Sequence, residues 1–240
     1  MNLIKYIYTK YKPLTHDVNG VTPNPNGSEF EVNNWILSEF ILRKIIPLVR
    51  AHPYPLNELM MMTGAICRFQ PTHVFEWGTN IGASARIFHE TACHFKIPME
   101  IHSIDLPMDV HHSEHPGSSR GRLVRGRTGV FLHLGDGLDT SVAIARRLTP
   151  SQRLLFFIDG DHSYSVVKNE LEVIFKNFEK PVVMLHDTFF QSCESGYNVG
   201  PFEAIRDVLK SEKYINKFTT NSTYSGLPGM TIIYPKQKNV

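Results

Sequence analysis

Short apolar runs alternate with amphipathic stretches from residue 72 onward. The first, third, fourth and fifth apolar runs are each followed by a stretch whose composition or apolar spacing suits a helix, whereas a long loop over 107–129 follows the second. This alternation is typical of βαβ units, in which a parallel sheet is covered by helices on both faces. The seven strand-like runs are 72–77, 100–106, 130–136, 153–159, 181–187, 214–220 and 229–235. The last two have no helix between them, so we expect one antiparallel strand near the C-terminus.

Before this alternation, the sequence predicts loop and helix. Residues 1–30 carry prolines, glycines and asparagines in close succession and predict irregular structure. Apolar residues at helical spacing then predict a helix over 32–46 that ends near Pro47. A second helix is expected over 55–69, with Pro55 in its first turn, where proline is favoured.

The length and composition describe an ordinary globular chain. Its 240 residues suffice for one sizeable domain, so we expect a loop and helical extension over 1–70 and a Rossmann-like α/β domain over 71–240. The net charge of +2 gives no bulk attraction to nucleic acid or to a membrane. No apolar run reaches the ~18 residues that a membrane span needs.

The three cysteines indicate a reducing compartment. Cys67, Cys93 and Cys193 lie far apart and form no C-x-x-C pair. A disulfide framework and a zinc knuckle are therefore disfavoured, and a cytoplasmic location is expected. The lysine-bearing N-terminal stretch also lacks the unbroken apolar core of a signal peptide.

Acids and glycines follow the predicted strands at the points where these end. In an open α/β sheet, ligands bind beyond the carboxyl ends of the strands. We therefore expect these groups to meet on one rim and to form a ligand site. They are Glu76, Gly78, Thr79, Asn80, Gly82 and Ser84 after the first strand, Asp105 after the second, Asp136 and Gly137 after the third, Asp159, Asp161 and His162 after the fourth, and His186 and Asp187 after the fifth.

The first glycine loop excludes two common nucleotide motifs. Gly78 and Gly82 match neither the dinucleotide fingerprint G-x-G-x-x-G nor the phosphate-binding P-loop. Glycines here still permit tight turning and the close approach of a ligand. Glu76 would repel a pyrophosphate and suits a cationic or hydroxyl-rich ligand. Asp105, about one βα unit later, is placed to accept hydrogen bonds from ribose hydroxyls.

Several motifs resemble those of the class I S-adenosylmethionine (SAM)-dependent methyltransferases. FEWGTNIGAS, SIDL and LGDG resemble that family's glycine, ribose and adenine motifs. FIDGDHSYSVVKNEL followed by VVMLHDT resembles a narrower group of small-molecule O-methyltransferases, which includes macrolide-sugar methyltransferases and cephalosporin-hydroxylase-like proteins. The resemblance covers residues 72–235. It implies SAM as cofactor and methyl transfer to a hydroxyl of a small molecule.

The resemblance also implies a role for each matching residue. Glu76 would lie near the methionine portion of the cofactor, Asp105 would bind the ribose, and Asp136 with Gly137 would flank the adenine. The implied cofactor-binding residues are Glu76, Gly78, Thr79, Asn80, Gly82, Ser84, Asp105, Asp136, Gly137 and Asp159.

The catalytic assignments rest on the same resemblance and contain one departure. Asp159 matches an acid that helps to hold Mg²⁺ in the sugar methyltransferases, and His162 matches a general base. In those enzymes two acids at the next strand end complete the metal site, but this chain has His186 and Asp187 there. Imidazole suits Mn²⁺, Fe²⁺ or Zn²⁺ better than Mg²⁺. Three alternatives remain open: His186 is not a ligand of a metal site at Asp159 and Asp187, the metal differs, or no metal binds.

Other functions compete with this interpretation. The histidine- and arginine-rich stretch over 107–129 would suit a nucleic-acid methyltransferase or a lid over an anionic substrate, although no D/N-P-P-Y/F/W motif is present. A non-catalytic SAM-binding protein would keep the same pocket. Asp161 alone is explained by helix capping. The sequence names no acceptor, and the apolar helix over 32–46 leaves a homo-oligomer open.

Overall fold

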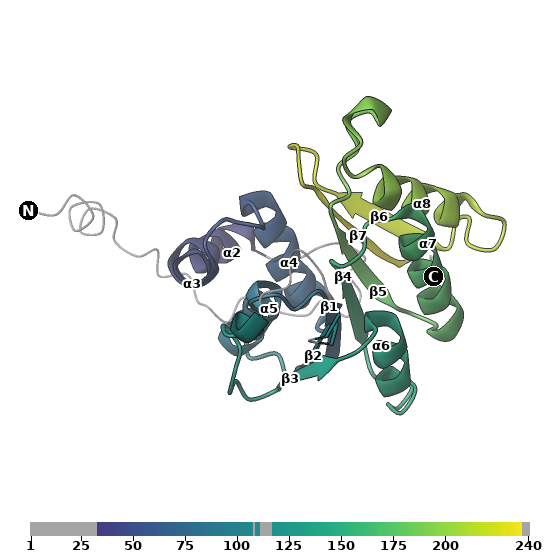
Figure 1. Cartoon of the computed structure of the whole chain (residues 1–240). Helices are drawn as coiled ribbons and strands as arrows, with labels where there is room; N and C mark the ends of the chain where they lie inside the picture. Colours follow the sequence, from purple (N-terminus) through teal and green to yellow (C-terminus); the bar gives the residue numbers. More distant parts are fainter. Residues whose placement is uncertain (1–32, 108, 111–116, 237–240) are drawn as a thin grey trace, which may run out of the picture.

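One seven-stranded sheet forms the centre of the protein. The computed structural model describes residues 33–107, 109–110 and 117–236, so the loop predicted over 1–30 lies outside the described residues. The strand order is β3-β2-β1-β4-β5-β7-β6 (Figure 1). β7 pairs antiparallel with both of its neighbours, whereas the other pairs are parallel. The strands are β1 (His73–Trp77), β2 (Glu100–Asp105), β3 (Val130–Leu134), β4 (Leu154–Ile158), β5 (Val182–His186), β6 (Phe218–Ser222) and β7 (Met230–Pro235).

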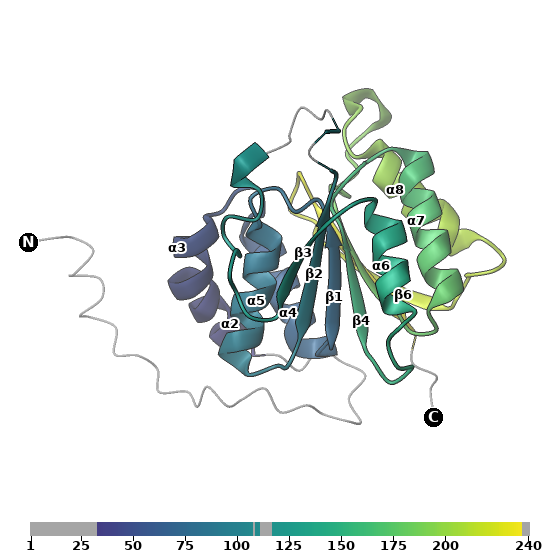
Figure 2. The same ribbon diagram turned by 60° about the horizontal axis from the view of Figure 1, so that its bottom comes forward.

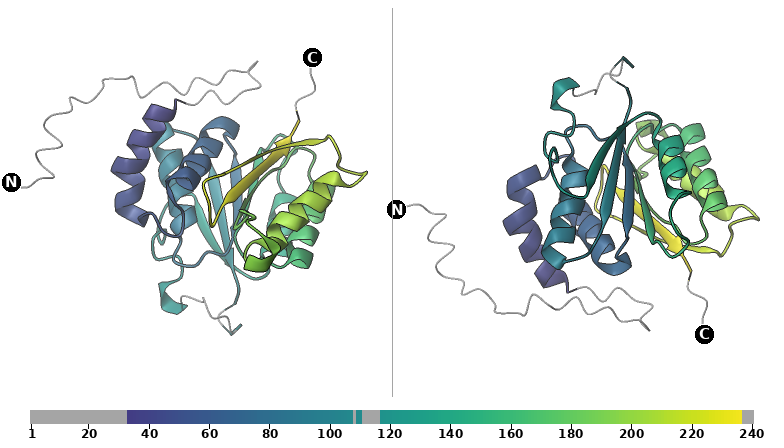
Figure 3. Two further views of the ribbon diagram at one scale, coloured as in Figure 1. Left: turned by 90° about the horizontal axis from the view of Figure 1, so that it is seen from above. Right: turned by 90° about the horizontal axis from the view of Figure 1, so that it is seen from below.

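Helices cover both faces of this sheet, as Figures 2 and 3 show from three directions. One layer holds α2 (Asn34–Phe40), α3 (Ile46–Val49), α4 (Leu56–Phe69) and α5 (Ala83–Phe95). The other holds α6 (Gly137–Ala145), α7 (Tyr164–Asn177) and α8 (Val199–Lys210). The predicted fold class is therefore confirmed: a mostly parallel seven-stranded sheet, helices on both faces and one antiparallel strand near the C-terminus.

The central strands explain the unbroken apolar runs in the sequence. Every residue of β1 and β5 is buried, and β4 is buried after its first residue. Strands with helices on both faces need apolar side chains at successive positions rather than at alternate ones. Trp77 pairs with Ile158 on β4 and with Ile104 on β2, so these three strands end level with one another.

The N-terminal helices share a core with the sheet. Leu37 of α2 and Met62 of α4 belong to the same buried cluster as Phe157 of β4 and Met184 of β5. Each of these side chains is at most 1% exposed, and burying one contributes roughly 2 kcal/mol. Packing is thus continuous across the boundary predicted at residue 70, and the boundary itself stays a prediction.

The first helical segment runs further than predicted. It passes through a π-helical turn at Ile41–Ile45 and continues as α3 beyond Pro47. Proline removes one backbone hydrogen bond and crowds the carbonyl four residues earlier. A helix can absorb this irregularity with a wider π turn instead of ending.

The sixth strand begins later than predicted. The backbone N–H groups of Tyr214 and Ile215 both donate to the carbonyl of Ser211, so this stretch forms a turn. β6 begins only at Phe218. Tyr214 still packs inward, since it is 5% exposed and its ring meets that of Phe175 edge-on, whereas Ile215 is 51% exposed.

The described part of the chain contains no helix with both the length and the apolar character needed to cross a membrane.

A buried acid connects α7 with the end of β1. Glu170 is 5% exposed, and its Oε1 accepts a hydrogen bond from Trp77 Nε1 at 2.8 Å. Its Oε2 has no hydrogen-bond partner within the described residues. Burial raises the pKa of Glu170 to about 8. The folded protein therefore favours the protonated acid, whereas the unfolded chain releases this proton at about pH 4.3.

Glu170→Gln is expected to remove a pH-dependent loss of stability. The protonated acid's contribution is complete below about pH 4.3 and is lost as the pH rises through about 8, because the folded-state pKa is the higher one. Glutamine does not titrate and keeps the acceptor for Trp77. The free energies of unfolding of the variant and the wild type are measured by urea titration at pH 5 and at pH 8.5. The difference, variant minus wild type, should be larger at pH 8.5 by about 1 kcal/mol or more. The exposed control Glu172→Gln should show no such trend, and a pH-independent difference for Glu170→Gln would contradict this account.

Candidate functional site

Gly78 lets the ends of two strands come together. It follows β1 with φ +96°, a conformation that side chains disfavour. A Cβ atom at Gly78 would lie only 2.1 Å from the backbone oxygen of Asp159, which follows β4. The absence of a side chain therefore brings the glycine loop into contact with the residues after β4.

Glu76 is a fully buried acid within β1. Its Oε1 accepts a hydrogen bond from Ser103 Oγ at 2.6 Å, and Ser103 Oγ lies 2.7 Å from Thr79 Oγ1. Burial raises the pKa of Glu76 to about 7, and the negative charges of Asp159 and Asp105 add to this rise. Its Oε2 is buried and finds no hydrogen-bond partner in the part of the chain that the structure describes. One carboxyl oxygen of Glu76 is therefore unpaired among the described residues and closed off from solvent.

The glycine loop reaches the end of β2. The backbone N–H of Asn80 donates to Asp105 Oδ2 at 3.1 Å. Gly82 precedes α5 with φ +88°, and Ser84 in the first turn is 2% exposed. The structure thus gathers the predicted cofactor residues of the first two strands, namely Glu76, Gly78, Thr79, Asn80, Gly82, Ser84 and Asp105.

An arginine from the segment after β2 covers Asp105. Arg120 Nε lies 3.3 Å from Asp105 Oδ2, while Asp105 Oδ1 accepts from the backbone N–H of Leu106 at 2.8 Å. Arg120 also donates to the carbonyl of Leu106, and the N–H of Gly121 donates to the carbonyl of Asn80. Part of the predicted lid therefore lies against the glycine loop. His111, His112 and His115 of that segment lie outside the described residues.

Asp136 and Gly137 have clear roles in the fold. Asp136 caps α6, since its Oδ1 accepts from the N–H of Asp139 at 2.8 Å. A Cβ atom at Gly137 would lie 2.3 Å from the side chain of Trp77, so glycine lets α6 pack against β1. Their predicted contact with adenine stays a prediction.

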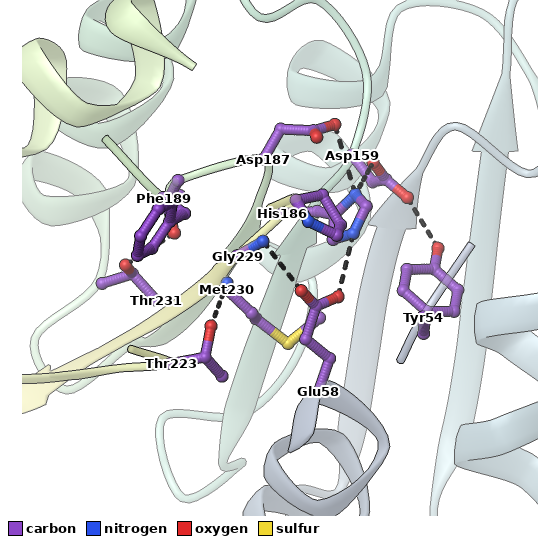
Figure 4. A network of polar contacts seen from close by, with 12 residues as sticks. Tyr54, Glu58, Asp159, His186, Asp187, Phe189, Thr223, Gly229, Met230 and Thr231 are labelled. Carbon is purple, nitrogen blue, oxygen red and sulfur yellow. Dashed lines mark hydrogen bonds and ion pairs between the residues drawn. The ribbon is translucent and has the colours of Figure 1, made fainter. Parts of the chain in front are cut away.

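Asp159, His186 and Asp187 converge, as Figure 4 shows. His186 Nδ1 lies 3.0 Å from Asp159 Oδ1 and 3.3 Å from Asp187 Oδ2. The second oxygen of each carboxylate is held from outside: Tyr54 donates to Asp159 Oδ2 at 2.6 Å, and Tyr197 donates to Asp187 Oδ1 at 2.8 Å. One ligand atom from each of the three groups therefore lies within 4.8 Å of the other two.

Glu58 holds the other side of the His186 ring. This residue of α4 is fully buried, and its Oε2 lies 3.0 Å from His186 Nε2. Its Oε1 accepts from the backbone N–H of Gly229 at 2.8 Å (Figure 4). The carboxylate thus fixes the orientation of the imidazole and connects α4 to the loop before β7.

The three carboxylates govern the protonation of His186. Burial alone would lower the pKa of His186, but its hydrogen bonds to Asp159, Asp187 and Glu58 outweigh burial and hold that pKa far above its usual range. Burial would raise the pKa of Asp159, but hydrogen bonds from His162, His186 and Tyr54 lower it. In the absence of another cation, His186 is therefore an imidazolium ion among carboxylates.

His162 stands at the open side of this cluster. Its Nε2 lies 3.4 Å from Asp187 Oδ2 and 3.8 Å from Asp159 Oδ1, and its side chain is 38% exposed. Burial lowers the pKa of His162, but the bond to Asp159 and the charge of Asp187 raise it overall. Asp161 points elsewhere: its Oδ1 accepts from the N–H of Ser163 in a turn just before α7. The predicted capping role is wrong in detail, because Ser163 is the N-cap residue of α7 and its side chain makes no capping hydrogen bond.

Sequence reasoning missed Glu58 and Tyr54. Both lie in the N-terminal extension, more than 100 positions before the residues that they contact. A signal was present, since Glu58 occupies the same helical stripe as Met62 and Ile66, both fully buried. An acid in such a stripe needs a polar partner. The identity of that partner depends on the tertiary fold.

Solved O-methyltransferases share this architecture. An O-methyltransferase from Bacillus cereus, solved with S-adenosylhomocysteine (SAH), is 14% identical over 83% of this chain and 90% of that chain, with a TM-score of 0.55. TomG from Streptomyces achromogenes, an O-methyltransferase involved in tomaymycin synthesis and solved with SAM, is 14% identical over 88% and 100% of the two chains, with a TM-score of 0.56. CalS11, a TDP-rhamnose 3′-O-methyltransferase of calicheamicin biosynthesis, is 16% identical over 82% and 86%, with a TM-score of 0.52.

These likenesses confirm the fold of the class I methyltransferases that the sequence motifs predict. No protein-family model matches the sequence, and no curated protein matches it either.

Gly78→Ala is expected to push the glycine loop after β1 away from Asp159 after β4. The added Cβ would overlap the Asp159 carbonyl, and alanine would have to adopt an unfavourable φ. The free energy of unfolding should fall by about 2 kcal/mol or more. Gly126→Ala is the matched control, since Gly126 has φ +76° but nothing within 4 Å of its Cβ position; it should cost about 1 kcal/mol. If urea titration gave the same loss of unfolding free energy for both variants, the close contact between Gly78 and the Asp159 carbonyl would be contradicted.

Proposed function

We propose that this protein transfers a methyl group from SAM to a hydroxyl group of a small molecule, with a divalent cation held by Asp159, His186 and Asp187. The observation that carries the proposal is the position of this three-residue cluster. It lies against the glycine loop, on the rim of a class I methyltransferase sheet. A donor site and an acceptor site would thus be adjacent.

The residues after β1 and β2 suit the cofactor. SAM carries a cationic sulfonium and ribose hydroxyls, and its methyl group is already activated. Glu76 offers a buried carboxyl oxygen without a partner among the described residues, which suits the methionine portion. Asp105 offers carboxylate oxygens to the ribose hydroxyls, which would replace its present contact with Arg120. Asp136 and Gly137 would border the adenine, while glycine at 78 keeps this approach open.

The donor atoms of the cluster fit a divalent cation. Asp159 Oδ1, His186 Nδ1 and Asp187 Oδ2 lie at separations typical of neighbouring ligands on one ion. One imidazole nitrogen with two carboxylate oxygens suits Mn²⁺, Fe²⁺ or Zn²⁺ better than Mg²⁺. Glu58 would accept a hydrogen bond from His186 Nε2–H, and the proton on Nδ1 would be released to solvent so that Nδ1 could ligate the ion, an arrangement common around ligating histidines. Such an ion would lower the pKa of an acceptor hydroxyl bound to it.

His162 is placed to act as the general base. It would take the proton of the acceptor hydroxyl as the hydroxyl oxygen bonds to the methyl carbon and the carbon–sulfur bond breaks toward sulfur. Asp159 and Asp187 lie within 4 Å of its Nε2 and would stabilise the imidazolium that forms. The chain's main task is then to align donor and acceptor.

The acceptor is proposed to be a small molecule rather than nucleic acid. Two of the arginines after β2 turn toward the chain itself: Arg120 contacts Asp105, and Arg125 donates to the carbonyls of Ser118 and Arg120. They therefore contribute less to a basic surface than the sequence suggests. The named activity of CalS11 and the named role of TomG also favour hydroxyls of sugars and natural products.

Replacing His162 tests the assigned chemistry. Calorimetric titration should show micromolar binding of SAH to the wild type and to His162→Ala, because His162 stands at the acceptor side. With methyl-labelled SAM and a panel of nucleotide sugars and phenols, transfer by the variant should fall about tenfold or more. His94→Ala, at an exposed position on α5, is the control and should retain full transfer. Failure of the wild type to bind SAH would sink the proposed function, and unchanged transfer by His162→Ala would remove His162 as the base.

Replacing Glu58 tests the metal assignment. Glutamine at 58 keeps an oxygen for the N–H of Gly229 but removes the negative charge that orients His186. The dissociation constant for Mn²⁺, measured by calorimetry with SAH bound, should rise about tenfold or more, as for other partners of ligating histidines. Binding of SAH itself should change little. Wild-type Mn²⁺ affinity in Glu58→Gln would argue that His186 is not a ligand.

A further inference from the structure

Two histidines and a glutamate gather at the opposite end of the sheet, at the amino ends of β1 and β2. His73 begins β1 and pairs in register with Glu100, which begins β2. His102 lies two residues after Glu100 and therefore on the same face of the sheet. One ligand atom from each residue lies within 4.8 Å of the other two.

The separations suit ligands of a shared ion better than hydrogen bonds. Glu100 Oε2 lies 3.5 Å from His73 Nε2 and 3.7 Å from His102 Nε2. A hydrogen bond between nitrogen and oxygen would measure about 2.7–3.2 Å. Two ligands that each lie about 2.0–2.2 Å from a tetrahedral Zn²⁺ are roughly 3.4 Å apart. A small contraction would therefore complete a three-ligand site.

The far nitrogen of each ring is already engaged. His73 Nδ1 lies 3.1 Å from Thr72 Oγ1, and His102 Nδ1 lies 3.1 Å from His133 Nε2. A proton on His102 Nδ1 can be donated to His133, which leaves the lone pair of His102 on Nε2. Partners of this kind fix the tautomer of ligating histidines.

His102 Nε2 needs a partner that the described residues do not supply. The residue is 7% exposed, and this nitrogen makes no hydrogen bond to any described residue. Buried polar atoms without a partner are rare in native proteins. The ring itself is held in place, because it stacks between Phe75 at 5.0 Å and Phe131 at 5.2 Å.

The protonation states agree with this geometry. Burial lowers the pKa of His102 to about 4 and also lowers the pKa of His73. A lowered pKa favours the neutral ring, which is the form that binds a metal. Glu100 adds a negative charge, and its 52% exposed side chain leaves room for water in a fourth position.

We propose that His73, Glu100 and His102 bind Zn²⁺, or a similar divalent ion that prefers imidazole, and thereby join β1 to β2. The ligand set is two imidazole nitrogens and one carboxylate oxygen, with a fourth position open to solvent. The site is separate from the cluster at the carboxyl ends of the strands and does not depend on the proposed methyl transfer. A bound ion is expected to stabilise the pairing of β1 with β2 and so to hold the edge strands β2 and β3 to the rest of the sheet.

Zinc titration of the full chain, without a purification tag, tests this site. Asp187→Asn is introduced throughout, so that the cluster at Asp159 contributes little. The Asp187→Asn protein serves as the parent of all other variants. In competition with a chromophoric chelator, this parent should bind Zn²⁺ with micromolar or tighter affinity. Glu100→Gln should weaken binding about tenfold or more, because it removes a ligand at an exposed position. Zn²⁺ should also raise the thermal unfolding midpoint of the parent but not that of Glu100→Gln.

Two further variants make the outcome decisive. His102→Phe removes a ligand and keeps an aromatic ring in the stack, so a folded variant with weak Zn²⁺ binding would support the site. The triple variant His111→Ala, His112→Ala and His115→Ala removes the H-H-x-x-H sequence and should bind Zn²⁺ like the parent. Parent-like binding by both Glu100→Gln and His102→Phe would overturn the proposal, as would loss of binding in the triple variant alone.

Discussion

A buried imidazole ring among three carboxylates connects the N-terminal helices to the ends of β4 and β5. His186 lies between Glu58 of α4 on one side and Asp159 with Asp187 on the other. Buried charges are stable only when each has a partner, so removal of one member leaves the others uncompensated. The helix that carries Glu58 must therefore sit at one place on the sheet. The N-terminal extension is in this way part of the site rather than an addition to it.

The second constraint is the level ending of β1, β2 and β4. Register pairing sets Trp77 beside Ile104 and Ile158, and Gly78 then allows the loops to meet. A predicted cofactor region and a predicted acceptor region thus share one rim. The same register brings His73 beside Glu100 at the opposite ends of the strands. One set of strand pairings therefore creates two chemically different places, separated by about the length of a five-residue strand.

Periodicity in the sequence predicts the centre of the sheet well, because β1, β4 and β5 are buried on both faces and therefore read as unbroken apolar runs. It also places acids at strand ends, since polar residues directly after apolar runs mark those ends. It does not reveal Glu58 and Tyr54, whose contacts span more than 100 residues. Nor does it reveal that Asp136 and Gly137 serve α6, or that Arg120 lies on Asp105, because capping and packing depend on tertiary neighbours. The turn before β6 is not evident from the sequence because Tyr214 and Ile215 resemble residues of a strand, although Tyr214 packs from a turn and Ile215 is exposed.

The most direct test of the central claim is anomalous diffraction from crystals grown with SAH and Mn²⁺. SAH is expected along the loop after β1, with one Mn²⁺ peak between Asp159 Oδ1, His186 Nδ1 and Asp187 Oδ2. Glu58 should remain hydrogen-bonded to His186 Nε2 in that structure. SAH in place with no Mn²⁺ peak at those atoms, and with His186 still bridging the carboxylates, would contradict the metal site. SAH bound elsewhere would contradict the account of the rim as a whole.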